Sequence, residues 1–254
     1  MSRRARLAVA SFYVLLLGAW EVYGRLAYEP GKLLPPPTTI LRTLWEMRDA
    51  YLRDAWVTVQ EAGLGLLVGV VLGLGIALLV DRFARMGEGI YRLALVLYSV
   101  PLIALAPALV SALGIGLRSK VAIAALAAFF PVVVNVTTAL RSVDRRVLEL
   151  GRLLSVGRWR TLRFMRMPYA LPALFAALKI AGPAAVIAAM IAEWVGAERG
   201  LGLALLYAMF GFQLPNLWAI LLLSTLMTGF AFAVFEVLGR VATPWHASAQ
   251  RGER

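Results

Sequence analysis

A densely charged segment, RSVDRRVLELGRLLSVGRWRTLRFMRMPYALP at residues 141–172, separates two hydrophobic stretches of the chain. Eight arginines crowd residues 141–166, with Asp144 and Glu149 among them. Side chains of these types form ion pairs and charged hydrogen bonds, so the chemistry that they favour is electrostatic docking of a partner. The alternative is a positively charged inner loop that only anchors the orientation of the neighbouring membrane spans.

The spacing within this segment predicts two short helices. Asp144 is suited to cap a helix that begins at Arg145. The apolar residues on or near one face of this helix are Val147, Leu150, Leu153 and Leu154. On another face, Glu149 can pair with Arg145 and Arg152, and each pair contributes about 0.2–0.5 kcal/mol. The helix should end near residues 155–157, because glycine readily adopts the left-handed conformation that closes helices. The second helix, basic and suited to a membrane surface, includes Arg158, Trp159, Arg160 and Arg163.

The elements around this segment are predicted to be membrane-spanning helices. The 254 residues are 61% hydrophobic, with a mean hydropathy of +0.78, whereas soluble domains are about 45–50% apolar. Spans of about 20 apolar residues are expected near residues 7–26, 57–80, 93–115, 119–140, 171–195 and 217–238. Prolines inside these spans, Pro101 among them, predict kinks that neighbouring helices can accommodate. The predicted fold class is all-α, a polytopic membrane protein with about six transmembrane helices.

The charge distribution predicts that both termini face the cytoplasm. With the N-terminus inside, the inner segments hold 17 of the 26 lysines and arginines, and the outer segments hold 8. This bias follows the positive-inside rule, which accounts for the net charge of +12 without nucleic acid binding. The lack of cysteine and the single histidine, His246, exclude disulfides, zinc clusters and thiol nucleophiles. The N-terminus is predicted to be an uncleaved span, because Trp20, Glu21 and Tyr23 stand where a cleavage site would be.

The segment between the first two spans predicts a short helix on the outer side. The prolines at 35–37 form a stiff turn, after which Thr38 or Thr39 can cap an amphipathic helix. Such a helix would lie on the outer membrane surface. Contact with an external partner is the alternative.

Gly65, Gly69 and Gly73 recur at four-residue spacing in the second span. One face of that helix is therefore nearly bare, and another helix can approach it closely. Packing within one subunit is the favoured interpretation, and a contact between two subunits is the alternative.

Polar side chains inside spans are costly and usually face a bundle interior or a cavity. The candidates for a solute path are Ser99, Asn135, Thr137, Thr138, Thr225 and Thr228. For each of them taken individually, hydrogen bonding between helices is the simpler interpretation. Lys179 is expected to extend its ammonium group to the cytoplasmic face, and Glu236 to pair with Arg240.

Short motifs follow one another in a specific order along most of the chain. They are Leu34-Pro35, Ser99-Val100-Pro101, Leu113-Gly114-Ile115-Gly116 with Ser119-Lys120, Phe129-Phe130-Pro131, Asn135-Val136-Thr137, and Glu193-Trp194 followed by Gly200-Leu201-Gly202. Each is weak alone, whereas the ordered set is specific. In this order the chain resembles the permease subunits of ABC importers in the nitrate/sulfonate/taurine group.

Residues 141–172 resemble the cytoplasmic coupling loop of that family, the EAA loop. Glu149 matches its glutamate, Leu150-Gly151 replace its two alanines, and Met167-Pro168 replace its closing Leu-Pro. Ser155 stands where the family has a glycine. Because a serine in the left-handed conformation costs about 1–2 kcal/mol, the turn is expected to shift to Gly157.

The resemblance implies a type I ABC-importer transmembrane domain at residues 56–240, with a coupling loop at 141–170. Residues 1–55 would hold the first span and the external segment, and residues 241–254 a cytoplasmic tail. The residues implied for ATPase coupling are Asp144, Glu149, Leu150, Gly151, Leu154, Ser155, Gly157, Arg158, Trp159 and Pro168. Those implied for the translocation path are Ser99, Pro101, Asn135, Thr137, Thr138, Glu193, Thr225 and Thr228. Glu193 is further expected near the outer surface, where it gates the path or contacts a binding protein.

The implied assembly joins two copies of this chain to a cytoplasmic ABC ATPase and an external solute-binding protein, in a bacterial or archaeal cytoplasmic (inner) membrane. The chain has no GxxxxGK[ST] phosphate loop, so the partner uses the ATP and no cofactor or metal is expected here. Residues 177–202 and Pro244-Trp245-His246 look most like permeases for thiamine-precursor pyrimidines or riboflavin. Sulfonate, taurine or nitrate is the alternative solute class.

Two other classes of protein fit the sequence less well. An intramembrane enzyme needs a nucleophile with a base, paired aspartates or metal ligands, and the predicted spans contain no cysteine, histidine or pair of aspartates. A stand-alone secondary transporter would have buried ionisable residues in broken helices, and internal repeats, whereas the predicted spans hold few charges. Dependence of uptake on ATP would separate this alternative from an importer.

Overall fold

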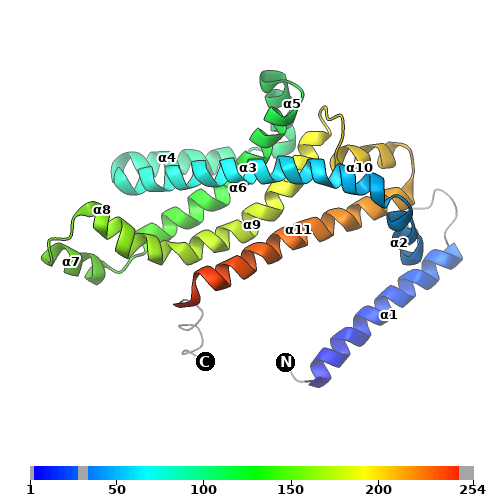
Figure 1. The fold of residues 1–254 in the computed structure, drawn as a ribbon, viewed down its shortest axis with the longest axis horizontal. Helices are drawn as coiled ribbons and strands as arrows, with labels where there is room; N and C mark the ends of the chain where they lie inside the picture. The colour runs from blue at the N-terminus through cyan, green and yellow to red at the C-terminus, as the bar shows by residue number, and fades with distance from the viewer. Residues whose placement is uncertain (1–2, 28–33, 246–254) are drawn as a thin grey trace. The chain divides into compact units, whose positions relative to one another are not determined.

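The computed structural model describes residues 3–27 and 34–245, and the regular secondary structure in these ranges is entirely helical (Figure 1). The elements are α1 (Arg3–Ala27), α2 (Pro37–Glu46), α3 (Arg48–Arg82), α4 (Ala84–Tyr98), α5 (Leu102–Leu113), α6 (Leu117–Arg141), α7 (Arg145–Leu153), α8 (Arg158–Thr161), the π-helical turn η1 (Leu162–Arg166), α9 (Met167–Glu193), α10 (Leu201–Phe210) and α11 (Leu214–Ala242). The predicted all-α fold is confirmed. Of the predicted tail at 241–254, residues 246–254 with His246 lie outside the described residues, and α11 extends to Ala242.

Among the described residues, four helices are long and apolar enough to cross a membrane, at Arg48–Arg82, Leu117–Arg141, Arg158–Glu193 and Leu214–Ala242. They coincide with the second, fourth, fifth and sixth predicted spans, and α1 covers the first. The third predicted span is not one helix, because α4 ends at Tyr98 and Pro101 caps the start of α5. Proline lacks a backbone N–H and disfavours helical geometry in the residue before it, so the predicted kink is a break.

The chain divides into two compact units. One consists of Met1–Val57 and Glu198–Thr225, and the other of Thr58–Ala197 and Leu226–Arg254. In the second unit, α6 and α9 pack against each other along their length (Figure 1). Their shared core is rich in small residues, including Ala124, Ala128, Val132, Ala181, Ala185 and Ala189. Small side chains let the two helices approach closely.

The glycine face of α3 packs against α6 within the same unit. A Cβ atom on Gly69 would lie 2.5 Å from the carbonyl oxygen of Ala125, and one on Gly73 would lie 2.9 Å from the Val132 side chain. These separations are shorter than real Cβ contacts. The interpretation of the glycine pattern as packing within one subunit is confirmed.

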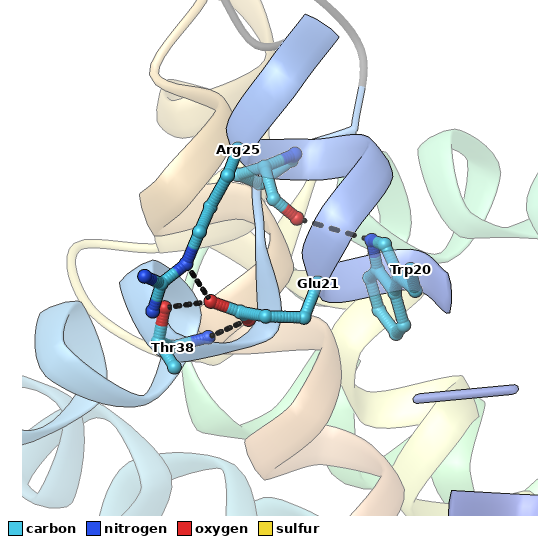
Figure 2. A network of polar contacts seen from close by, with 5 residues as sticks. Trp20, Glu21, Arg25 and Thr38 are labelled. Carbon is cyan, nitrogen blue, oxygen red and sulfur yellow. Dashed lines mark hydrogen bonds and ion pairs between the residues drawn. The ribbon is translucent and has the colours of Figure 1, made fainter. Parts of the chain in front are cut away.

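In the first unit, side chains of α1 hold the start of α2 (Figure 2). The Glu21 carboxylate accepts hydrogen bonds from the Thr38 N–H (3.0 Å) and hydroxyl (2.7 Å), and the Trp20 indole N–H donates to the Pro35 carbonyl (3.1 Å). The N-cap of α2 is Pro36 and makes no side-chain cap bond. The predicted capping by Thr38 or Thr39 is therefore wrong, because Glu21 satisfies the free N–H of the first turn from another helix.

Candidate coupling site and buried polar clusters

The coupling helix α7 begins at the residue that the sequence indicates. The Asp144 carboxylate accepts a 2.8 Å hydrogen bond from the Arg146 N–H, which is the bond expected from an N-cap side chain. A carboxylate at this end also interacts favourably with the helix dipole. Asp144 therefore defines the start of α7, as predicted.

The end of α7 differs from the prediction. Ser155 itself adopts the left-handed conformation, with φ of 53°, and the Val156 N–H donates to the Gly151 carbonyl at 2.9 Å. This is the long hydrogen bond of a Schellman motif. Gly157 is extended (φ −62°, ψ 152°) and serves as the N-cap of α8. The expected shift of the turn to Gly157 is wrong, because the terminal hydrogen bonds of α7 hold Ser155 in the position of the family glycine.

The apolar side chains on one face of α7 are exposed. In the sequence, the loop that carries α7 connects two membrane-spanning helices. The exposed fractions of Leu150, Leu153 and Leu154 are 55%, 82% and 67%. Glu149 is also exposed. The side chains of Arg145 and Arg152 lie outside the described set, so their pairing with Glu149 stays a prediction. An apolar patch bordered by charges is the composition expected of a surface that another protein covers.

The second half of the loop joins α7 to α9. Trp159 is 70% exposed, and Arg158 is exposed beside it. Gly151 is buried, and a Cβ there would lie 3.2 Å from the sulfur of Met165 in η1. Pro168 lies in the first turn of α9, where its missing N–H costs no helical hydrogen bond. Helix α7 is thus in contact with η1 within the loop, and the loop lies at the end of α6 and α9 opposite α5 (Figure 1).

Four of the eight candidate path residues bond to a backbone carbonyl one helical turn earlier. Ser99, Asn135, Thr138 and Thr225 each donate to the carbonyl four residues earlier, at 2.7–3.2 Å. Thr137 is buried, and its hydroxyl has no hydrogen-bond partner. Pro101 caps α5, and Thr228 makes an interaction of its own. These bonds satisfy the polar groups without a solute, so the path assignment of these residues stays a prediction.

Glu193 lies in a buried polar cluster and not at the surface. Its side chain is 0% exposed, and the Thr58 hydroxyl donates a 2.6 Å hydrogen bond to its carboxyl group. Glu61 lies beside Glu193 and Lys120, and the Lys120 ammonium group donates to the carbonyls of Gly116 and Gly196, both at 3.2 Å. Because Glu193 is buried, its side chain does not face a binding protein directly. Its position near the outer surface and its role as a gate stay predictions.

Three ion pairs lie toward the other end of these helices. The ammonium group of Lys179 binds Glu236 at 2.6 Å, and Glu236 also accepts from Arg240 at 2.8 Å. The predicted Glu236–Arg240 pair is confirmed. Lys179 bonds to Glu236 on α11, and its extension to the cytoplasmic face stays a prediction. Arg166 in η1 pairs with Asp81 near the end of α3.

Sequence reasoning missed the roles of Glu61, Lys120, Asp81 and Arg166. Glu61 carried a signal, because an acid inside an apolar run needs a buried partner. Its partner could not be chosen from local pattern, since Lys120 and Glu193 are 59 and 132 residues further along the chain. In the sequence, Lys120 counts among the charges of the outer segments and belongs to the Ser119-Lys120 motif, yet its side chain is 4% exposed.

These features define a multi-pass membrane protein with an exposed, partly apolar helical loop between two spans. Residues 66–248 match the family of binding-protein-dependent transport system inner membrane components, and the chain belongs to this family. It is the permease subunit of an ABC importer. Members of this family are transport components and not catalytic enzymes.

Relatives cover nearly the whole chain. The protein is 31% identical to the formylaminopyrimidine transport permease ThiX of Halalkalibacterium halodurans, over 92% of this chain and 94% of that protein. It is 29% identical to the riboflavin transport system permease RibX of Chloroflexus aurantiacus, over 92% and 88%. A chain of the inward-facing MetNI methionine ABC transporter shares the fold, with a TM-score of 0.67 and 22% identity over 77% of this chain and 97% of that one.

Proposed function

We propose that the loop at residues 144–158 docks on a separate cytoplasmic ABC ATPase, which supplies the energy for import. The observation that carries this proposal is the exposed apolar face of α7, with Leu153 82% exposed on a loop that begins and ends at membrane spans. Charged residues border this face, which favours a specific protein contact over burial in lipid. Membership of a binding-protein-dependent family supports the same assembly.

The test reverses one charge on α7. In Glu149→Arg, the ATPase should no longer co-purify stoichiometrically with the permease from native membranes, and ATP-dependent uptake should fall. Leu153→Asp should have the same effects, because the Leu153 side chain is exposed on the docking face and is not part of the core of the fold. Glu46→Arg makes the same charge change on the exposed surface of α2 and serves as the control. Unchanged co-purification in both α7 variants would refute the docking role.

The solute is proposed to be a small aromatic heterocycle, such as a thiamine-precursor pyrimidine or a riboflavin-like compound. The relatives that carry this proposal are ThiX and RibX, each similar over 92% of this chain. Sulfonate, taurine or nitrate is the second candidate. An external binding protein would deliver the solute, so the binding protein recovered with the permease should be screened against both classes by calorimetry. Uptake driven by an ion gradient without an ATPase would instead indicate a stand-alone secondary transporter.

The proposed assembly is a homodimer in a bacterial or archaeal cytoplasmic membrane, with both termini inside. Because the chain has no cysteine, single-cysteine labelling can test the orientation without background. Ser155→Cys should react with a membrane-impermeant thiol reagent only from the cytoplasmic side, and Thr39→Cys only from the outer side. Reaction of Ser155→Cys from outside would reverse the orientation and remove the ATPase docking proposal.

A further inference from the structure

The structure contains a direct link between the coupling loop and a membrane span to which the loop is not joined in sequence. A guanidinium nitrogen of Arg166, Nη1, pairs with Oδ1 of Asp81, 85 residues away. The two side chains are 25% and 17% exposed, so water screens the pair far less than a surface pair. Arg166 is the last residue of η1, and Asp81 is the second-last residue of α3.

The docking helix α7 contacts the turn that carries Arg166. Gly151 of α7 is buried, and a Cβ at this position would lie 3.2 Å from both Cε and the sulfur of Met165. Met165 precedes Arg166 directly, so the contact and the ion pair belong to the same turn of η1. A displacement of α7 would therefore press on the residue next to the one that holds α3.

The turn that holds both contacts is π-helical. Residues Leu162–Arg166 form a π turn between α8 and α9, within an otherwise continuous helical run from Arg158 to Glu193. A π turn has a wider hydrogen-bond spacing than an α-helix, and such turns often occur at functional sites. The irregularity lies where the loop becomes a span, which is the point at which motion of the loop must enter the membrane domain.

On the other side of the link, α3 is held tightly to α6. The backbones approach so closely at Gly69 and Gly73 that a Cβ at either position would contact atoms of α6 at less than 3.0 Å. Closely packed interiors have low compressibility and transmit strain. A force applied at Asp81 would accordingly be passed to α3 and α6 together.

The Arg166–Asp81 pair is incompletely satisfied in this conformation. The Nε atom of Arg166 is buried and has no hydrogen-bond partner, and an unpaired buried donor is destabilising. A guanidinium group can pair with a carboxylate through two nitrogens, but here one nitrogen holds the pair. The contact is therefore suited to changing its geometry when the loop moves.

We propose that Asp81 is a positioning residue for coupling, which receives the motion of the ATPase-docking loop through Arg166 and passes it to α3. The series of contacts runs from α7 through Met165 and Arg166 to Asp81. This proposal rests on the proposed docking of the loop on an ATPase. The proposal predicts that α3 responds to ATP. The sequence alone does not suggest this response, because α3 is remote from residues 144–158.

The test measures movement at the two ends of the link in the intact complex. Leu153→Cys on α7 and Leu79→Cys on α3 are introduced separately into the cysteine-free chain, at side chains that are 82% and 47% exposed. The rate of thiol labelling is compared with and without ATP and vanadate, which trap the ATPase in one state. In the otherwise unaltered permease, both positions should change their labelling rate on trapping.

Asp81→Asn should abolish the change at Leu79→Cys and leave the change at Leu153→Cys, with the ATPase still co-purifying. Asp81→Glu should restore part of the response, since it keeps the charge. Lys179→Met removes an ion pair of similar exposure between α9 and α11 and should leave the response of α3 intact. A merely structural role of Asp81 would lower protein yield or thermal stability in Asp81→Asn without selective loss of the vanadate response.

The outcomes separate the two proposals. If the ATPase does not co-purify and Leu153→Cys does not respond in the unaltered permease, the docking proposal fails. If Leu153→Cys responds and Leu79→Cys responds equally in Asp81→Asn, the docking proposal stands and the link through Asp81 is refuted.

Discussion

The Thr58 hydroxyl donates a 2.6 Å hydrogen bond to the Glu193 carboxyl group, which joins α3 to the end of α9 across 135 residues of sequence. Glu61 and Lys120 complete this buried cluster and connect it to α6. Carboxyl groups buried among helices need a positive partner and hydrogen bonds, because burial removes their hydration. The cluster therefore holds the same end of three helices together.

Lys120→Met should destabilise the protein by about 3 kcal/mol, because it removes the positive charge beside the buried Glu61 carboxyl group. It also removes the donor from the carbonyls of Gly116 and Gly196. Thermal unfolding in detergent measures the loss. Glu61→Gln added to Lys120→Met should recover part of the stability, because it removes one of two adjacent acidic groups that repel each other. As a control, Arg42→Met breaks an exposed pair with Glu46 and should have a much smaller effect, because solvent screens the pair. Equal effects at Lys120 and Arg42 would contradict the buried role.

Gly69→Ala should destabilise the packing of α3 on α6 by about 1–3 kcal/mol, because the added methyl group would meet a backbone carbonyl that cannot move aside. The control is Gly75→Ala in the same helix, where no atom lies within 4 Å of the new Cβ. This control should be neutral or stabilising by up to about 1 kcal/mol, since alanine is the better helix former. Unfolding in the same detergent compares the two variants, and similar stabilities would show that the glycine face is not closely packed.

Ser155→Gly should strengthen the end of α7 by about 1 kcal/mol, because glycine adopts φ of 53° without the steric cost of a side chain. The readout is hydrogen exchange of the Val156 amide, which donates to Gly151; its protection should rise roughly fivefold. Gly157→Ala is the matched control, since Gly157 has an extended conformation that alanine also adopts. A protection factor that is unchanged in Ser155→Gly would show that Ser155 is not strained.

The ion pair between Glu88 and Arg141 should make the contact of α4 with α6 sensitive to acid. The hydrogen bond from Arg141 lowers the pKa of Glu88 below its ordinary value, and Arg92 adds to this effect. A carboxyl group with a lower pKa in the folded state contributes stability above its unfolded pKa and loses it as the pH falls through the folded pKa. Glu88→Gln should therefore lower the Tm slightly at neutral pH.

This difference between Glu88→Gln and the unaltered protein should vanish well below about pH 4.3. Arg141→Gln should remove most of the same pH dependence, and combining the two substitutions should add little to either alone. The effect should be small, because the two side chains are 40–47% exposed. A Tm difference that persists at low pH would show that charge is not its cause.

The sequence predicted those features whose causes are local. Asp144 caps α7 because its carboxylate reaches an N–H two residues away, and Glu236 pairs with Arg240 one helical turn later. The membrane spans follow from runs of apolar residues, and the spacing of Gly65, Gly69 and Gly73 indicated a close helix contact before its partner was known. Pro101 also carried a local signal, although its effect is a break in the helix and not the predicted kink.

Contacts between distant parts of the chain were decided by the tertiary structure alone. Glu21 replaces the predicted threonine cap of α2, Glu193 is buried against Thr58, and Arg166 pairs with Asp81, although each partner is 17 or more residues away. A residue-by-residue pattern determines which side chains need partners, because burial and helical geometry act locally. It does not determine which partner each one receives, because that choice depends on how the helices pack in three dimensions.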